Sequence, residues 1–205
     1  LDVVGKGGHG SRPQDAVDPT VAAAQIICAL QTVVSREIPP GERVVISIGT
    51  LKSGSAVNVI PEKCEITGNI RTTNPDIRAT LPERIERIAQ GVGLAMRCRT
   101  DFRFIPVYPS VVNDEAMGLL LEEAAGELFG AEKVKRVPIS SGSDDFNFYS
   151  AERPSIYFNV GMGGLGTPYA AAHHSPQFRA NDAILKTCAA AVVATACKFL
   201  EAQTK

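Results

Sequence analysis

The pattern of apolar and polar positions in the first half of the chain switches repeatedly between the period of a strand and the period of a helix. Segments rich in β-branched residues, or in alternating apolar and polar positions, predict four strands at residues 2–9, 44–51, 63–72 and 97–107. Apolar residues at helical spacing predict helices over residues 19–35 and 76–96. The order β-α-β-β-α-β predicts a ferredoxin-like sandwich for residues 1–110, with both helices on one face of a four-stranded antiparallel sheet.

The residues that face the predicted core can be named for one helix and one strand. Asp18 is suited to cap the first helix, and Pro19 to begin it. The predicted core stripe of this helix consists of Val21, Ala24, Ile27, Cys28, Leu30 and Val34. The strand at residues 63–72 has one apolar face and one polar face, and the polar face consists of Glu65, Thr67, Asn69 and Arg71.

A different unit is predicted after Tyr108-Pro109. Asp114 can cap a helix that runs to about Phe129, and Asp182 begins a long helix near the C-terminal end. Two short segments between these helices are predicted as strands, one at residues 134–139 and a compact apolar one at residues 155–160. A parallel sheet needs partners on both sides of each strand, and two strands cannot complete one. We therefore expect residues 111–205 to be an incomplete α/β unit, so that the chain as a whole is mixed α/β and α+β.

The charge and the apolar runs of the chain limit its partners. A net charge of -1, without a long basic run, gives no electrostatic reason to expect nucleic acid or an anionic membrane as a partner. The apolar run from Ala189 to Ala196 is shorter than the roughly 20 residues that cross a bilayer. We therefore expect neither nucleic acid nor a membrane as a partner.

The cysteines point to a reducing compartment. The chain has five, an odd number, and they are widely scattered without metal-ligand spacing. Most lie in apolar segments, where the expected role is that of a small buried hydrophobe with a free thiol. A cytoplasmic location is the resulting expectation.

The three histidines occur in two motifs with possible chemistry. His9 follows Gly5-Lys6-Gly7-Gly8, whose glycines allow unusual backbone conformations and close approach to a ligand. This run lacks the GxGxxG spacing and the following helix of a dinucleotide site. The second motif is His173-His174-Ser175-Pro176, and a neutral imidazole is a common zinc ligand. If the segment is extended, adjacent side chains point to opposite faces, and one of the two histidines at most binds a given ion.

Four motifs in order resemble those of the M20 metallopeptidase and amidohydrolase family, especially the branch that cleaves N-acyl amino acids. They are GKGGHGSRP from Gly5, NVIP from Asn58, GSDDF from Gly142 and HHSP from His173. The resemblance implies that residues 1–110 are the lid or dimerisation domain and that residues 111–205 are the C-terminal part of the catalytic domain. The family has GSEDF where this chain has GSDDF, one methylene shorter, so the roles of Asp144, Asp145 and His173 stay open. Capping of the following helix is an equally good interpretation of the two aspartates.

Roles for four residues follow from this resemblance. His9 is expected to reach across a homodimer interface and stabilise the oxyanion formed when the amide is attacked, an interaction worth about 3 to 4 kcal/mol. Asn58 is expected to make a polar contact to substrate, and Arg71 to hold the substrate carboxylate. His174 is expected to be the last metal ligand of a site with two divalent ions, with zinc as the first expectation and manganese or cobalt as alternatives.

The resemblance implies that the parent enzyme hydrolyses the amide of N-acyl amino acids or small peptides. The family's other metal ligands and its catalytic glutamate precede residue 1, so we expect this chain alone to be inactive, because one loop histidine cannot hold two ions. A non-catalytic dimerisation or ligand-sensing module is the alternative, since ferredoxin-like domains serve many functions.

Overall fold

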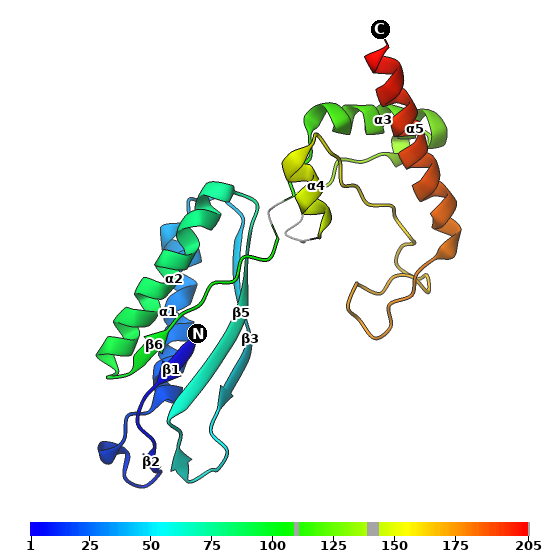
Figure 1. The fold of residues 1–205 in the computed structure, drawn as a ribbon. Coiled ribbons are helices and arrows are strands. Elements are labelled where there is room, and N and C mark those ends of the chain that lie inside the picture. Colours follow the sequence, from blue (N-terminus) through cyan, green and yellow to red (C-terminus); the bar gives the residue numbers. More distant parts are fainter. Residues whose placement is uncertain (109–110, 139–143, 205) are drawn as a thin grey trace. The chain divides into compact units, whose positions relative to one another are not determined.

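The computed structural model describes residues 1–108, 111–138 and 144–204, and these form two compact units (Figure 1). Unit 1 comprises residues 1–108, and unit 2 comprises residues 111–138 and 144–204. The strands of unit 1 are β1 (Asp2–Val4), β2 (Gly8–His9), β3 (Val44–Ser53), β4 (Val59–Ile60), β5 (Lys63–Thr72) and β6 (Arg99–Asp101). Its helices are α1 (Pro19–Glu37) and α2 (Pro75–Ala95), with a short 3-10 turn at Pro13–Asp15.

Unit 1 is built on a four-stranded antiparallel sheet. The strand order is β3-β5-β1-β6, while β2 and β4 form a separate two-stranded ladder. The two helices lie side by side along one face of the sheet, and apolar residues of both pack with those of β1 and β5 (Figure 1). The predicted ferredoxin-like arrangement is therefore confirmed.

Both helices of unit 1 begin where a side chain caps them. Asp18 Oδ1 accepts hydrogen bonds from the N–H groups of Thr20 at 2.8 Å and Val21 at 3.4 Å. Asn74 Oδ1 plays the same part for α2, accepting from Asp76 and Ile77. In each helix proline follows the cap, where its fixed φ suits the first turn and its missing N–H costs no hydrogen bond.

The core face of α1 is one position away from the predicted stripe. The helix buries Pro19, Ala22, Ala23, Ile26, Leu30 and Val33, whereas Val21 and Cys28 are exposed. Most residues between Val21 and Val34 are apolar, so two neighbouring stripes both satisfy helical spacing. The chosen face contains Ala22 and Ala23, whose small side chains let α1 lie close to the sheet.

Strand β5 alternates as its sequence predicts, whereas β6 is much shorter than predicted. Cys64 and Ile66 on the helix-covered face of β5 are 0% and 3% exposed. The segment predicted as a strand over residues 97–107 forms only the three residues of β6. Its ladder partner is β1, which pairs with it from Val4↔Arg99 to Asp2↔Asp101, so the length of β1 limits β6.

Unit 2 consists of helices and loops. Its elements are α3 (Glu115–Phe129), a 3-10 turn at Ala131–Lys133, α4 (Phe146–Glu152), a 3-10 turn at Asp182–Ile184, and α5 (Leu185–Gln203). Asp114 caps α3 as predicted, with its Oδ1 2.9 Å from the Met117 nitrogen. Helices α3 and α5 pack together, and Lys198 Nζ joins them by contacts of 2.8 and 2.9 Å to Glu123 and Glu127.

The strands predicted for unit 2 are wrong for the residues that the structure describes. Neither residues 134–138 nor residues 155–160 form a strand, and residue 139 lies outside the described part of the chain. A strand requires a partner for its backbone hydrogen bonds, and the described part of unit 2 contains no strand that could supply one. The apolar composition of these segments therefore predicted strands that unit 2 by itself does not form.

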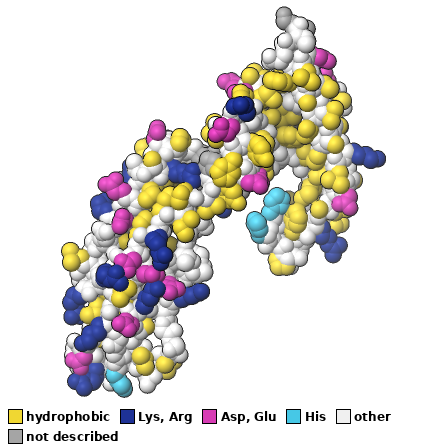
Figure 2. All heavy atoms as spheres, in the orientation of Figure 1, with side chains coloured by type: hydrophobic (Ala, Val, Ile, Leu, Met, Phe, Trp, Pro, Cys, Tyr) yellow, Lys and Arg dark blue, Asp and Glu magenta, His cyan; other side chains and the backbone are white. Residues whose placement is uncertain are grey.

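Much of the apolar surface of unit 2 is exposed, as Figure 2 shows around α3 and α5. The outer side of α5 presents Leu185, Val192, Val193 and Leu200, each more than half exposed. The helical segment Asp182–Gln203 is long and apolar enough to cross a membrane by length and composition alone. This segment is longer than the apolar run at residues 189–196, because further apolar residues of the helix lie on both sides of that run. One such helix is weak evidence for a membrane span.

Candidate functional site

His9 and Asn58 are brought together by the small ladder of β2 and β4. Gly8 pairs with Ile60 and His9 pairs with Val59. The next hydrogen bond runs from the Gly10 nitrogen to the Asn58 carbonyl oxygen at 2.8 Å. Two of the residues predicted to act on substrate therefore lie on adjacent backbone segments at one end of unit 1.

The glycines around His9 are explained by close packing within the chain. A Cβ atom on Gly10 would lie 2.9 Å from the Asn58 carbonyl oxygen, and one on Gly8 would lie 2.9 Å from the Ala16 Cβ. A Cβ on Gly5 would collide with the Val17 carbonyl oxygen. None of these glycines has a positive φ. The expectation of unusual backbone conformations is therefore wrong here, and the close approach is to other parts of unit 1.

The His9 ring is exposed and is held on one side by Ser11. The Ser11 backbone nitrogen lies 3.2 Å from His9 Nδ1, and Ser11 Oγ lies 2.8 Å from the same atom. The Arg12 nitrogen donates to the His9 carbonyl oxygen at 2.8 Å, which closes a tight turn over residues 9–12. Arg12 forms an exposed ion pair with Asp15 at 2.9 Å. The turn therefore fixes the position of the imidazole although the ring lies at the surface.

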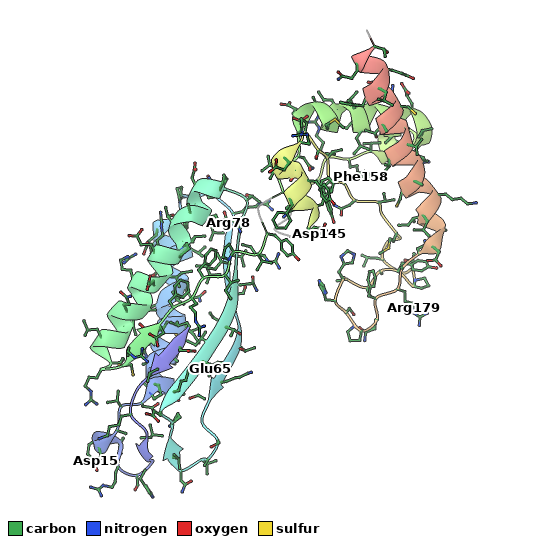
Figure 3. The ribbon with its side chains drawn as sticks, viewed as in Figure 1. Asp15, Glu65, Arg78, Asp145, Phe158 and Arg179 are labelled. Carbon is green, nitrogen blue, oxygen red and sulfur yellow. The ribbon has the colours of Figure 1, made fainter. Side chains whose placement is uncertain are left out.

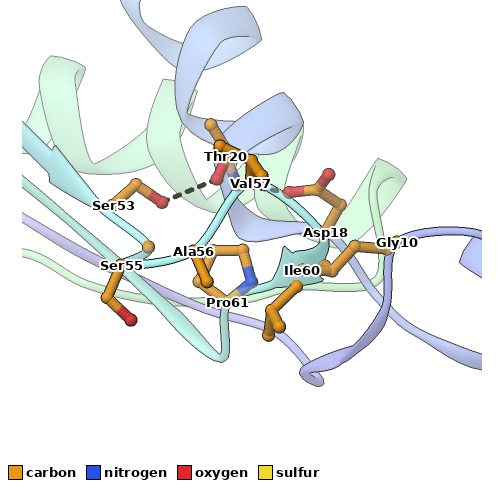
Figure 4. Close-up of a pocket in the computed structure, with 11 residues that line it drawn as sticks. Gly10, Asp18, Thr20, Ser53, Ser55, Ala56, Val57, Ile60 and Pro61 are labelled. Atoms are coloured by element: carbon orange, nitrogen blue, oxygen red, sulfur yellow. Dashed lines mark hydrogen bonds between the residues drawn. The ribbon is translucent and has the colours of Figure 1, made fainter.

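A wide, open pocket of about 620 Å³ lies beside this turn (Figure 4). Thr20 Oγ1 and Ser53 Oγ are hydrogen-bonded at 2.6 Å on its wall, and Asp18 lies near them. The full lining is Gly10, Asp18, Thr20, Ser53, Gly54, Ser55, Ala56, Val57, Val59, Ile60 and Pro61. Thr20 and Ser53 could not be recognised as pocket residues from sequence, because they are 33 positions apart and belong to no motif.

Arg71 lies at the other end of unit 1. It pairs with Val45 near the end of β5, whereas Lys63, at the start of β5, pairs with Val4 near the His9 turn. Eight residues of strand separate Lys63 from Arg71, which corresponds to about 26 Å. The Asn58 and Arg71 of one chain are therefore too far apart to contact the same small substrate.

Charged side chains lie on three strands of the open face of the sheet, and Lys63 joins two of these strands, β5 and β1. Lys63 Nζ lies 3.0 Å from Asp2 and 2.8 Å from Glu65. The hydrogen bond from Lys63 lowers the pKa of Asp2 below its usual value. The bonds to Glu65 and then to Asp2 raise the pKa of Lys63. On the neighbouring strand, Arg99 pairs with Asp101 at 2.7 Å, so this face is polar where the other is apolar.

His174 lies in a turn of unit 2. Its φ of 65° is in the left-handed region, which is uncommon for a residue other than glycine. The Ser175 nitrogen donates to the Ala172 carbonyl oxygen at 3.2 Å. The His173 ring packs edge-on against the Phe178 ring, with 5.0 Å between the two ring centroids. The segment is therefore a turn. The expectation that the two histidines point to opposite faces assumed an extended segment, and it does not apply to this turn.

The described residues do not fit a two-metal site on their own. Residues 1–108, 111–138 and 144–204 contain no group of three His, Cys, Asp or Glu side chains that could hold an ion. His174 is exposed, and it is one possible ligand rather than part of such a group. Any site for two ions needs ligands from outside the residues described here.

Asp144 stabilises the first turn of α4. Its Oδ1 accepts a hydrogen bond from the Phe146 nitrogen at 3.0 Å, and this bond lowers the pKa of Asp144. The Tyr157 hydroxyl donates to Asp144 Oδ2 at 3.4 Å, and burial raises the pKa of that phenol. Asp145 begins α4 without a capping bond from its side chain (Figure 3). The capping interpretation is thus supported for Asp144, while Gly142 and Ser143 of the motif lie outside the described residues.

The chain is similar to known proteins along most of its length. Residues 1–96 match the family model described as a peptidase dimerisation domain of the M20 type. The chain is 38% identical over 185 residues to an uncharacterised hydrolase of Sinorhizobium fredii, covering 90% of this chain and 46% of that protein. It is 36% identical over 183 residues to the N-acetylcysteine deacetylase of Bacillus subtilis, covering 89% of this chain and 46% of the enzyme.

A solved structure agrees with these relatives. It is a Bacillus subtilis protein described as a dinuclear metal-binding peptidase of the M20 family, with 30% identity and a TM-score of 0.71. The similarity covers 98% of this chain and 50% of that one. The chain therefore spans about half the length of the curated relatives and of the solved structure that it matches.

Proposed function

Because this chain belongs to the M20 family of peptidases and amidohydrolases, we propose that the complete gene product hydrolyses the amide bond of N-acyl amino acids or small peptides. The N-acetylcysteine deacetylase relative, whose name describes removal of an acyl group from an amino acid, supports this substrate class. The presentation of His9 by the β2–β4 ladder carries the proposal, because an exposed imidazole on an ordered turn can reach a substrate outside its own unit.

In this proposal His9 donates a hydrogen bond to the oxyanion that forms at the substrate carbonyl. Such a donor stabilises the transition state more than the substrate, because the negative charge develops only during the attack. Asn58, whose backbone is bonded to Gly10, contributes a polar contact to the same substrate. The neighbouring pocket, with Thr20 and Ser53 on its wall, offers room beside that contact.

Arg71 is proposed to hold a substrate carboxylate through its guanidinium, which can bind a carboxylate with two hydrogen bonds. Since about 26 Å of strand separates it from the His9 end of the same unit, one chain serves two substrate molecules. A pair of chains then forms two substrate sites. The match of residues 1–96 to a dimerisation domain supports a homodimer formed through unit 1.

The complete gene product is proposed to use two divalent ions, as supported by the dinuclear relative, with zinc as the first candidate and manganese or cobalt as alternatives. His174 is the proposed ligand from this chain. Its left-handed φ supports this role, because strained backbone is often retained where a side chain must be aimed. Since the described residues hold no complete metal site, we propose that this chain alone is inactive.

The five free cysteines, none of them in a disulfide, support a reducing compartment and hence a cytoplasmic location.

A non-catalytic dimerisation module is the second candidate for the chain by itself, and the match of residues 1–96 favours it. The two candidates differ in one measurement. Turnover of N-acetyl amino acids by the complete gene product, together with about two bound ions per chain, supports the enzyme. A complete gene product that forms dimers but binds no metal and releases no amino acid would support the module.

A further inference from the structure

The two hydrogen bonds at His9 Nδ1 come from one neighbouring residue. The Ser11 backbone nitrogen lies 3.2 Å from Nδ1, and the Ser11 hydroxyl oxygen lies 2.8 Å from it. A backbone N–H can only donate, so in this bond Nδ1 must be an acceptor and carry no hydrogen. In a neutral imidazole the hydrogen then resides on Nε2.

We propose that Ser11 is a positioning residue that holds His9 in its Nε2–H tautomer, with the donor N–H directed away from the turn. The inference rests on the proposed function of His9, since an oxyanion can be stabilised only by a ring nitrogen that carries a hydrogen. If the hydrogen moved to Nδ1, it would face the Ser11 N–H, and Nε2 would present a lone pair to the oxyanion. The serine therefore selects the ring form that can donate outward.

The rest of the turn supports this arrangement. The bond from the Arg12 nitrogen to the His9 carbonyl oxygen, at 2.8 Å, keeps the Ser11 N–H close to the imidazole. On the other side of His9, the bond from the Gly10 nitrogen to Asn58 ties the turn to the neighbouring segment. Both ends of the turn are thus fixed by backbone hydrogen bonds, and the imidazole cannot leave Ser11 without rotating about its own side-chain bonds.

The tautomer can be measured directly in this chain by nuclear magnetic resonance of ¹⁵N-labelled histidine. Proton–nitrogen correlations through two and three bonds identify which ring nitrogen carries the hydrogen. Spectra at about pH 8.5, well above the usual histidine pKa of about 6.5, report the neutral ring. A His9→Gln variant assigns the His9 signals, and His173 and His174 serve as internal references.

We expect His9 to hold its hydrogen on Nε2 in a larger fraction than either reference histidine. Ser11→Ala keeps the backbone N–H but removes the hydroxyl, which makes the shorter of the two contacts to Nδ1. It should therefore increase the Nδ1–H fraction of His9 at least twofold while Nε2–H stays the major form, whereas Ser11→Thr keeps both groups and should preserve the wild-type distribution. Ser35→Ala is the matched control, because Ser35 Oγ bonds to the Gln31 carbonyl oxygen on the surface of α1. A wild-type His9 with its hydrogen on Nδ1, or a distribution unaffected by Ser11→Ala, overturns the proposal.

Kinetics of the complete gene product separate this inference from the proposed function. Ser11→Ala should lower kcat about 3- to 10-fold with KM unchanged, the factor expected for one ordinary hydrogen bond, and Ser11→Thr should restore it. If His9→Gln leaves kcat unchanged, the proposed role of His9 is wrong, whatever the tautomer. If His9→Gln lowers kcat but Ser11→Ala does not, the role of Ser11 is overturned while that of His9 stands.

Discussion

The side-chain amide of Asn113 pairs with the backbone of Tyr157 as a neighbouring strand would. Asn113 Nδ2 donates to the Tyr157 carbonyl oxygen at 2.9 Å, and the Tyr157 nitrogen donates to Asn113 Oδ1 at 2.8 Å. The following Asp114 nitrogen donates to the Ser155 carbonyl oxygen at 2.9 Å. The apolar segment at residues 155–160 is therefore held by two consecutive residues at the start of α3.

The first prediction follows from this pair. Asn113→Ala should release the Tyr157 backbone and lower the free energy of local opening by about 1 to 3 kcal/mol, because two ordinary hydrogen bonds are lost. Amide hydrogen exchange at Tyr157 measures this loss. Ser35→Ala, on the surface of α1 in unit 1, is the control, because it should leave exchange at Tyr157 unchanged. Equal exchange rates in the wild type and in Asn113→Ala would mean that the pair does not hold the segment.

The second prediction concerns the glycine next to the histidine. Gly10→Ala should destabilise unit 1 by about 1 to 3 kcal/mol, because the new Cβ would lie 2.9 Å from the Asn58 carbonyl oxygen. Gly91→Ala in α2 is the control, since nothing lies within 4 Å of its Cβ position. That substitution should stabilise the helix by about 0.5 to 1 kcal/mol. Denaturant titrations of the two variants compare them, and a loss of stability in both would contradict the close-contact argument.

The third prediction separates the two proposed histidine roles in the complete gene product. His174→Ala should remove bound metal and activity together, as judged by metal analysis and turnover. His9→Ala should leave the metal bound and lower kcat about 10² to 10³-fold, as for the loss of one oxyanion donor.

Mixed dimers give a further check of the same roles. If His9 acts on the partner's site, mixing the His9→Ala and His174→Ala proteins should restore part of the activity. Full activity of His9→Ala, or turnover by the 205-residue chain alone, would show that the roles are assigned wrongly.

The fourth prediction concerns the thiols. Cys28 and Cys197 are exposed, whereas Cys64 and Cys98 are buried, and burial raises the pKa of both buried thiols. Because the thiolate is the reactive form, iodoacetamide should modify Cys28 and Cys197 in the native chain well before Cys64 and Cys98. Mass spectrometry of timed digests measures the order, and denatured chain, in which all thiols should react alike, is the control.

The fifth prediction concerns the ion pair between Asp2 and Lys63. The lowered pKa of Asp2 means that its contribution is present above the usual aspartate value of about 4 and is lost as the pH falls through the folded value. The raised pKa of Lys63 means that its contribution is present below about 10.4 and is lost as the pH rises through the folded value. Asp2→Asn should therefore weaken the fold slightly between about pH 4 and 10 and leave it unchanged at about pH 2. Urea titrations at these pH values compare the stability of the wild type and Asp2→Asn. A difference in stability that persisted at about pH 2 would not be explained by the ion pair.

The sequence predicted unit 1 well because its periodicity and its tertiary contacts agree. The cap at Asp18 and the alternation along β5 depend on neighbouring residues, so a local pattern suffices to find them. The stripe of α1 was misplaced because most positions between Val21 and Val34 are apolar, and only packing against the sheet decides which side is buried.

The remaining differences arise from contacts between distant residues. The apolar segment at residues 155–160 has the composition of a strand, but a strand depends on a partner elsewhere in the chain. The His174 turn could not be anticipated because its left-handed φ is set by the surrounding loop, and histidine does not demand it. His9 and Asn58 could be chosen from sequence motifs, but the β2–β4 ladder is what places them on adjacent backbone segments.

The crowding around Gly5, Gly8 and Gly10 also has an evolutionary consequence. A substitution at these positions disturbs folding whether or not the protein is an enzyme, because each Cβ would meet atoms of the same unit. His9 is exposed, so the fold places a weaker demand on its identity. A related protein that has lost catalytic activity is therefore expected to keep the glycines but not the histidine. Inactive relatives should be recognisable by substitution at the histidine position.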